Sequence, residues 1–195
     1  LINYKGKVES PSFQISKIAA NEWVSSSGFV LNFQGQNFNP KIMTASIDGK
    51  LTNSILRGNP IAETTLEANI SDGIAIAEVG ISDTLIKMNL DAPLDLTQER
   101  THALLNGDIA HADLVKLRLW NNASDTALKI SAKLYTEASI NLTEQNPVDD
   151  LQADVRLTNT HIQRNDASVK FNSLSLTAKQ ENFRKSIALQ SDLAD

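Results

Sequence analysis

Apolar and polar residues alternate along three successive segments in the second half of the chain. The segments cover residues 128–134, 138–142 and 151–157, and within each of them every second residue is apolar. Because successive side chains of a strand point to opposite faces of a sheet, this pattern is typical of strands with one aliphatic face and one solvated face. Polar residues that favour turns separate the segments, including the run 143–150.

The rest of the chain repeats this alternation in short segments. Residues 29–33, 66–70 and 86–90 are the clearest, and stretches rich in Gly, Asn or Pro lie between the segments. A spacing of about 8 to 12 residues between turn signals is expected of all-β folds. The pattern predicts an all-β chain of about a dozen strands, built as a long meander with mostly antiparallel pairing. No change in composition divides residues 1–195 into separate domains.

Local signals place the turns more closely. Asp-Gly between apolar runs predicts a tight hairpin at Asp48-Gly49 and another at Asp72-Gly73. A change of face is expected after Ile76, and Gly80 predicts a bulge. Proline cannot donate to a ladder, so all prolines are predicted to lie between strands. They are Pro11, Pro40, Pro60, Pro93 and Pro147.

Amino-acid composition indicates whether the space beside such a sheet is filled by side chains. Hydrophobic residues make up 41% of the chain, but aromatic residues only 5%. The apolar set is mostly Leu, Ile, Ala and Val, which gives a smooth aliphatic surface with few large side chains to fill a thick sandwich. This composition indicates an open or hollow architecture.

Charge and cysteine content exclude several classes of protein. The formal net charge is −5, and no run of Lys or Arg with interleaved aromatics is present, which argues against nucleic acid as a partner. The chain has no cysteine, so disulfides and thiolate chemistry are excluded. No run approaches the roughly 18 apolar residues of a membrane-spanning helix.

The sequence offers one weak candidate for metal binding and none for catalysis. His111 lies close to Asp108 and Asp113, but an isolated histidine between two carboxylates is usually a surface feature. No spacing typical of a catalytic or nucleotide-binding motif occurs. We therefore predict a protein that is not an enzyme and that has no cofactor and no metal. Trp23 and Trp120 are expected to be half-buried aromatics at strand ends.

Three phrases of the sequence resemble a known family. They are FQGQNFNPKIMTASIDGKL, GDIAHADLVKLRL and FRKSIALQSDLAD. In the first phrase, the matching residues form a turn and a strand from Gly35 to Gly49. In the second phrase the matching residues are Ile109, Ala112, Asp113, Leu114, Leu117 and Leu119. In the third they are Leu189, Ser191, Asp192 and Asp195. These phrases resemble the TamB-like proteins of Gram-negative envelopes, which belong to the AsmA-like superfamily.

The resemblance implies a long periplasmic protein that is anchored in the inner membrane, of which this chain is an internal segment. Its strands are expected to roll into a taco-like trough with an aliphatic interior. Such proteins are linked to phospholipid passage between membranes and to outer-membrane protein biogenesis, and they meet an Omp85-type barrel. The resemblance carries over no catalytic residues.

Together, the alternation and the resemblance suggest a segment that holds or conducts phospholipid acyl chains. The predicted lining residues are Ile86, Met88, Leu90, Leu128, Ile130, Ala132, Leu134, Ile140, Leu142, Val155 and Leu157. Three alternatives stay open. The same residues would form the core of a closed sandwich; the sheet edge would serve as a scaffold for β-barrel strands; or the chain would be a carbohydrate-binding module, for which exposed aromatics and a polar cluster are lacking.

Overall fold

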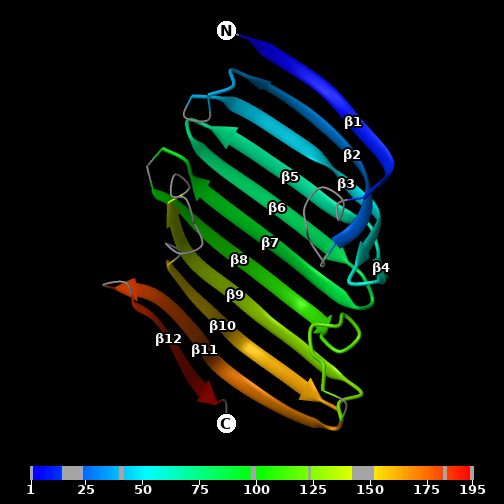
Figure 1. Cartoon of the computed structure of the whole chain (residues 1–195), viewed down its shortest axis with the longest axis vertical. Helices are drawn as coiled ribbons and strands as arrows, with labels where there is room; N and C mark the ends of the chain where they lie inside the picture. The colour runs from blue at the N-terminus through cyan, green and yellow to red at the C-terminus, as the bar shows by residue number, and fades with distance from the viewer. Residues whose placement is uncertain are drawn as a thin grey trace.

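All described strands of the chain belong to one open antiparallel sheet (Figure 1). The computed structural model describes residues 2–14, 24–39, 42–97, 100–122, 124–141, 152–181 and 184–193. Its strands are β1 (Asn3–Phe13), β2 (Val24–Gln36), β3 (Thr44–Leu56), β4 (Asn59–Ile61), β5 (Thr64–Ser71), β6 (Ile74–Ser82), β7 (Ile86–Asp95), β8 (Arg100–Asp113), β9 (Leu128–Asn141), β10 (Gln152–Arg164), β11 (Ala167–Glu181) and β12 (Arg184–Leu193).

The strands pair in the order in which they follow one another in the chain. The order across the sheet is β1-β2-β3-β5-β6-β7-β8-β9-β10-β11-β12, and the short β4 pairs with β3. The predicted all-β meander is therefore confirmed. The closed sandwich is wrong for the described residues, because no second sheet covers the first. Neither β1 nor β12 has a neighbour on its outer side in the described sheet.

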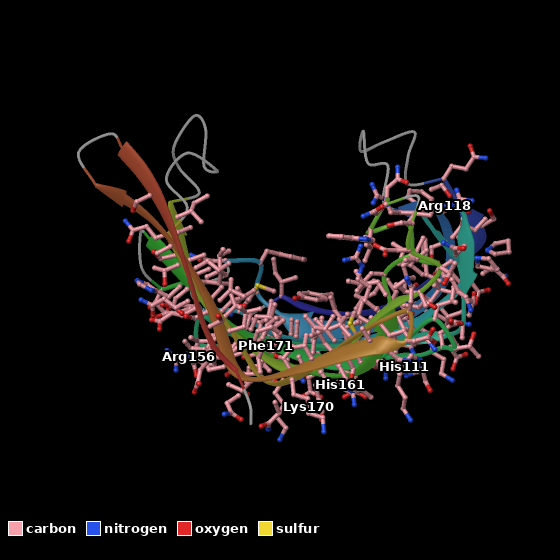
Figure 2. The ribbon with its side chains drawn as sticks, turned by 90° about the horizontal axis from the view of Figure 1, so that it is seen from below. His111, Arg118, Arg156, His161, Lys170 and Phe171 are labelled. Carbon is pink, nitrogen blue, oxygen red and sulfur yellow. The ribbon has the colours of Figure 1, made fainter. Side chains whose placement is uncertain are left out.

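The sheet is curled into a trough. Figure 2 shows that the long strands bend into a U whose two arms carry the strand ends. Bulges contribute to this bend, because an extra residue in one strand increases its local curvature. The ladders show them in β3 at Asn53, in β8 between Ile109 and Ala112, and in β10 at Asn159. The described part of the chain contains no helix that is long and apolar enough to cross a membrane.

The two Asp-Gly pairs behave differently. Asp72 and Gly73 form the β5–β6 turn with φ angles of 50° and 79°, as a type I′ hairpin requires. Asp48-Gly49, by contrast, lies inside β3, so the hairpin predicted there is wrong. Gly49 pairs with Leu31 on one side and Leu66 on the other. A side chain at this position would collide with the carbonyl oxygen of Val30, so here glycine permits close packing within the sheet.

The proline prediction is also wrong. Pro11 lies within β1, Pro60 within β4 and Pro93 within β7, while Pro40 and Pro147 lie outside the described residues. β7 accommodates its proline because the ladder with β8 is interrupted: pairs are recorded at Asp91 and again at Leu94, but none lies between them. The missing N–H donor therefore falls where no ladder bond is made.

Strand β6 is more regular than its sequence indicates. Its ladders with β5 and β7 run without a register shift through Gly80, so the predicted bulge is wrong. The apolar side chains do change face after Ile76, as predicted, and they do so without any irregularity of the strand. Ile74 and Ile76 lie on one face throughout, and Ala75, Ala77 and the following alternate residues lie on the other. β6 thus carries large apolar residues on both faces.

Candidate functional site

Cross-strand register assigns the described strand residues to one side of the trough or the other. Residues directly opposite each other in an antiparallel ladder share a face. Figure 2 shows Phe171 inside the U and the basic side chains of β10 and β11, Arg156, His161 and Lys170, outside it. Phe171 shares its face with Val169, and Val169 pairs with Ile162 of β10. The same face can then be followed from strand to strand in both directions.

Most side chains on this inner face are apolar, and most of these are aliphatic. Ile162 pairs with Ile130 of β9, and Ile130 pairs with Ala112 of β8. From there the register gives the inner residues of the central strands, which are Leu66, Ala68, Ile70, Ala75, Ala77, Val79, Ile81, Ile86, Met88, Leu90, Leu94, Ala103, Leu105 and Ile109. Towards β1 the inner face continues through Phe29, Leu31, Phe33, Ala45, Ile47 and Leu51.

Charged residues of the strands lie on the outer face. Glu67 and Glu78 pair with each other there, and so do Asp108 and Lys133. Where side chains are described, Arg164 is the one charged residue that the ladders place on the inner face, where it pairs with Leu128. The charged side chains of the strands are therefore concentrated on the outer face, although β6 also places Ile74 and Ile76 there.

The register brings most of the predicted lining residues onto this inner face. They are Ile86, Met88, Leu90, Leu128, Ile130, Ala132, Leu134, Val155 and Leu157. For Ile140 the structure describes only the backbone, which pairs with Thr101 in the β8–β9 ladder. Leu142 lies outside the described residues.

One lip of the trough is filled by the protein's own side chains. Residues 114–122, here called the strap, follow β8, and their Leu117 is fully buried against Ile61, Ile86 and Ala112. Met88 and Ile130 pack partly against this cluster. Ile86 is therefore a residue of a small core and is not open to a ligand.

The strap reaches across three strands to hold the opposite side of this lip. The guanidinium of Arg57 donates to the carbonyl oxygen of Arg118 at 2.6 Å. The side-chain amide of Asn59 donates to the carbonyl oxygen of Lys116 at 2.8 Å. Its first turn is closed by a bond from the Leu117 N–H to the Asp113 carbonyl at 2.9 Å. Since β5, β6 and β7 lie between β8 and the β3–β4 pair, the strap spans their ends.

Elsewhere several large side chains of the inner face are exposed. Ile47 in β3 is 36% exposed, Val169 in β11 is 37% exposed and Leu176 in β11 is 40% exposed. In β12 the inner residues Ile187 and Leu189 are more exposed still. These large apolar side chains form an open apolar surface on the inner face of the sheet.

A groove of about 500 Å³ opens on the inner face beside the strap. Its lining comprises Leu114, Trp120, Leu128, Ile130, Ile162, Arg164, Ala167, Ser168 and Val169. These residues come from the strap and from β9, β10 and β11, so the groove forms only when the strap is in place. Apart from Arg164, Ser168 and Trp120, the side chains of its lining are aliphatic.

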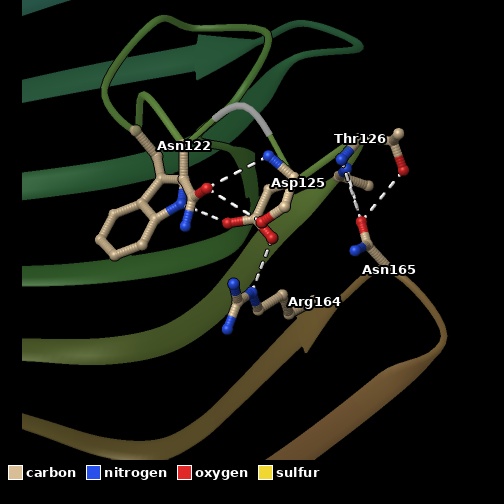
Figure 3. Close-up of polar contacts among 8 residues, drawn as sticks. Asn122, Asp125, Thr126, Arg164 and Asn165 are labelled. Atoms are coloured by element: carbon tan, nitrogen blue, oxygen red, sulfur yellow. Dashed lines mark hydrogen bonds and ion pairs between the residues drawn. The ribbon is translucent and has the colours of Figure 1, made fainter.

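A polar network joins two residues of the groove lining, Trp120 and Arg164, through Asp125 (Figure 3). The Nε of Arg164 donates to Oδ1 of Asp125 at 2.7 Å, and the indole Nε1 of Trp120 donates to Oδ2 of the same carboxylate at 2.6 Å. The Asp125 side chain is only 1% exposed. Hydrogen bonds from Arg164, and secondly from Trp120, lower the pKa of Asp125 below its usual value, while burial opposes them.

Sequence reasoning missed this network. Trp120 was expected only as a half-buried aromatic, and neither Asp125 nor Arg164 stands in a motif. Asp125 and Arg164 lie 39 positions apart, and they meet because β9 and β10 pair with Leu128 opposite Arg164. The one available signal was the arginine itself, at a position of β10 that continues the aliphatic alternation.

The predicted metal candidate does not assemble. The Nε2 of His111 lies 3.1 Å from the carbonyl oxygen of Asp83 and 3.2 Å from that of Thr84. Asp113 instead accepts a bond from the Lys116 N–H at 3.1 Å. Within the described ranges no group of three or more His, Asp or Glu side chains is arranged to hold a metal ion.

Comparisons with known proteins do not assign the chain to a family, so its function is inferred from the fold and the inner face. No protein-family model matches the chain, and neither curated proteins nor solved structures give a significant match. The class of protein is therefore defined by geometry alone: an open antiparallel β-trough with an aliphatic inner face.

Proposed function

We propose that the chain holds or conducts phospholipid acyl chains along its trough, as a segment without enzymatic activity. The continuous aliphatic inner face, followed by register from β1 to β12, is the observation that carries this proposal. Burial of a methylene group contributes up to about 0.8 kcal/mol, so acyl chains bind such a face without specific polar contacts. A trough that extends across the strands also lets an acyl chain slide, because each step exchanges one aliphatic contact for another.

The resemblance to TamB-like proteins supplies the setting of this proposal. In that setting the chain is an internal segment of a periplasmic protein anchored in the inner membrane, and it passes phospholipid between the inner and outer membranes. Neighbouring segments of the same protein would continue the trough at β1 and β12, and an Omp85-type barrel would receive it at the outer membrane. Both free edges support continuation, because each presents unpaired backbone groups.

The same edges support a second candidate function. A free antiparallel edge pairs with an incoming strand by β-augmentation, which would make the chain a scaffold for outer-membrane β-barrel assembly. In this role the inner face would matter less than the backbone of β12 or β1. The two functions therefore respond differently to a charge placed inside the trough.

A pair of matched substitutions tests the proposed lipid function. Ile47→Glu places a carboxylate on the inner face, and Ile76→Glu makes the same change on the outer face at similar exposure. We expect the purified wild-type chain and Ile76→Glu to carry phospholipid that organic extraction and mass spectrometry detect, and Ile47→Glu to carry several-fold less, because a buried carboxylate is costly next to acyl chains.

Equal lipid loading of both variants, or no lipid in the wild-type chain, would contradict acyl-chain binding. Binding of unfolded barrel peptides that is unaffected by Ile47→Glu would instead favour the scaffold.

A further inference from the structure

The groove beside the strap differs from the rest of the trough because a cationic side chain belongs to its lining. Arg164 is the only charged residue in its lining, and the Arg164 side chain is 53% exposed. The remaining lining includes Ile130, Ile162 and Val169, which lie together on the inner face. The groove thus combines an exposed guanidinium, of which one nitrogen is paired with Asp125, with a mainly aliphatic lining, and this arrangement suits an anionic amphiphile.

Asp125 holds Arg164 by only one of its nitrogens. The bond runs from Nε, and Figure 3 shows that the two terminal nitrogens of the guanidinium make none of the marked contacts. Among the described residues no side chain or carbonyl group accepts a bond from either Nη. The two Nη groups of an arginine form a planar fork that matches the oxygens of a phosphate or carboxylate.

The other bonds of the network fix this fork in position. Asp125 is buried and accepts from Trp120 as well as from Arg164, so both of its oxygens are in use. Nearby, Asn165 Oδ1 accepts bonds at 3.0 Å from both the N–H and the hydroxyl of Thr126, which ties the end of the loop to the β10–β11 turn. A guanidinium held in this way loses little conformational freedom when a second anion binds.

We propose that Arg164 binds the phosphate of a phospholipid whose acyl chain lies on Ile130, Ile162 and Val169. The inference rests on the proposed function and adds an orientation to it: the head group stays at the lip beside the strap, and the tail points along the floor of the trough. The volume of about 500 Å³ lies in the range typical of small-molecule sites.

Two amphiphiles with the same acyl chain and different head groups distinguish the contribution of the head group to binding from that of the tail. We would titrate the chain with lysophosphatidic acid and with the matching monoacylglycerol, both below their critical micelle concentrations, and measure dissociation constants by calorimetry. A charge-assisted hydrogen bond corresponds to about tenfold or more in affinity, so the wild-type chain is expected to prefer the phosphate by at least that ratio.

Arg164→Gln is expected to bring this ratio close to one while the affinity for monoacylglycerol stays within about twofold. Arg156→Gln makes the same change on the outer face of the same strand and is expected to leave the preference unchanged. Equal affinity of the wild-type chain for both amphiphiles would overturn the inference and leave acyl-chain binding intact. Failure of both to bind would instead contradict the proposed function.

A double variant covers the case in which Arg164→Gln leaves Asp125 unpaired and disturbs the strap. Asp125→Asn with Arg164→Gln removes both charges and keeps groups that hydrogen-bond to each other and to Trp120. This variant is expected to bind monoacylglycerol like the wild-type chain and to show no preference for the phosphate. A preference that persists in the double variant would overturn the role of Arg164.

Discussion

Two asparagines lie at points where the alternation of faces is reset. Asn53 and Asn159 have φ angles of 50° and 51°, in the left-handed region that asparagine tolerates better than most residues. Each lies in a bulge, which inserts one extra residue. In β10 the residues before the bulge, such as Leu157, and those after it, such as Ile162, therefore both face inwards although their spacing is odd.

Asn159→Val should destabilise the chain by about 1 kcal/mol or more, since a β-branched side chain in the left-handed region clashes with the backbone. Asn159→Gly should cost only about a few tenths of that, because glycine adopts this conformation without strain. Urea unfolding followed by circular dichroism measures both. Thr158→Val, at a neighbouring position with ordinary φ, is the control. If it costs as much as Asn159→Val, backbone conformation is not the cause.

Asp125 makes the stability of the contacts around Trp120 of the strap dependent on pH. Its folded-state pKa is depressed by Arg164 and Trp120, so the carboxylate stabilises the folded state at all pH values above its unfolded pKa, whose usual value is 3.8. This contribution is lost as the pH falls below 3.8 towards the folded pKa. In a Trp23→Phe background, Trp120 fluorescence should change in that acidic range and remain constant above it.

The Asp125→Asn variant serves as the reference for this titration, because its amide does not ionise. It should show no transition of Trp120 fluorescence at the same pH. A transition of equal size in the variant would assign the change to general acid unfolding and not to Asp125.

At the scale of elements, the strap is the part of the chain that gives the trough a core. Leu117 is its anchor, while Leu119, only two residues on, is 38% exposed. Leu117→Ala should lower the free energy of unfolding by about 2–5 kcal/mol, as expected when a buried leucine is truncated and leaves a cavity. Leu119→Ala should change it by less than about 0.5 kcal/mol, as is usual at exposed positions. Equal effects of the two in thermal unfolding would mean that the strap does not pack.

The strands were easier to predict than the turns that join them. Around Asp48-Gly49 the apolar residues keep one phase, from Ala45 and Ile47 to Leu51, so the strand continues through the pair. Around Asp72-Gly73 the inner residues are Ile70 and Ala75, an odd separation that a single regular strand does not allow. The phase of the flanking residues, more than the dipeptide, decides between strand and turn.

For the molecule as a whole, the amphipathic alternation was enough to predict an all-β meander, and the scarcity of aromatic residues indicated an open architecture. The alternation was not enough to predict the curl or the groove. Bulges contribute to the curl, and they appear in the sequence only as breaks in the alternation of apolar and polar residues. The groove depends on contacts between residues far apart in the chain, such as Asn59 with Lys116 and Asp125 with Arg164. Local periodicity carries no information on such pairs.

An arrangement in which each long strand touches mainly the strands beside it has a mechanical consequence. Such a sheet behaves as a linear array, in which stability is approximately a sum of terms between nearest neighbours. The outermost strands can then peel away and re-anneal while the middle, which the strap ties together, remains intact. A molecule built in this way can lengthen or exchange partners at its ends without unfolding its centre.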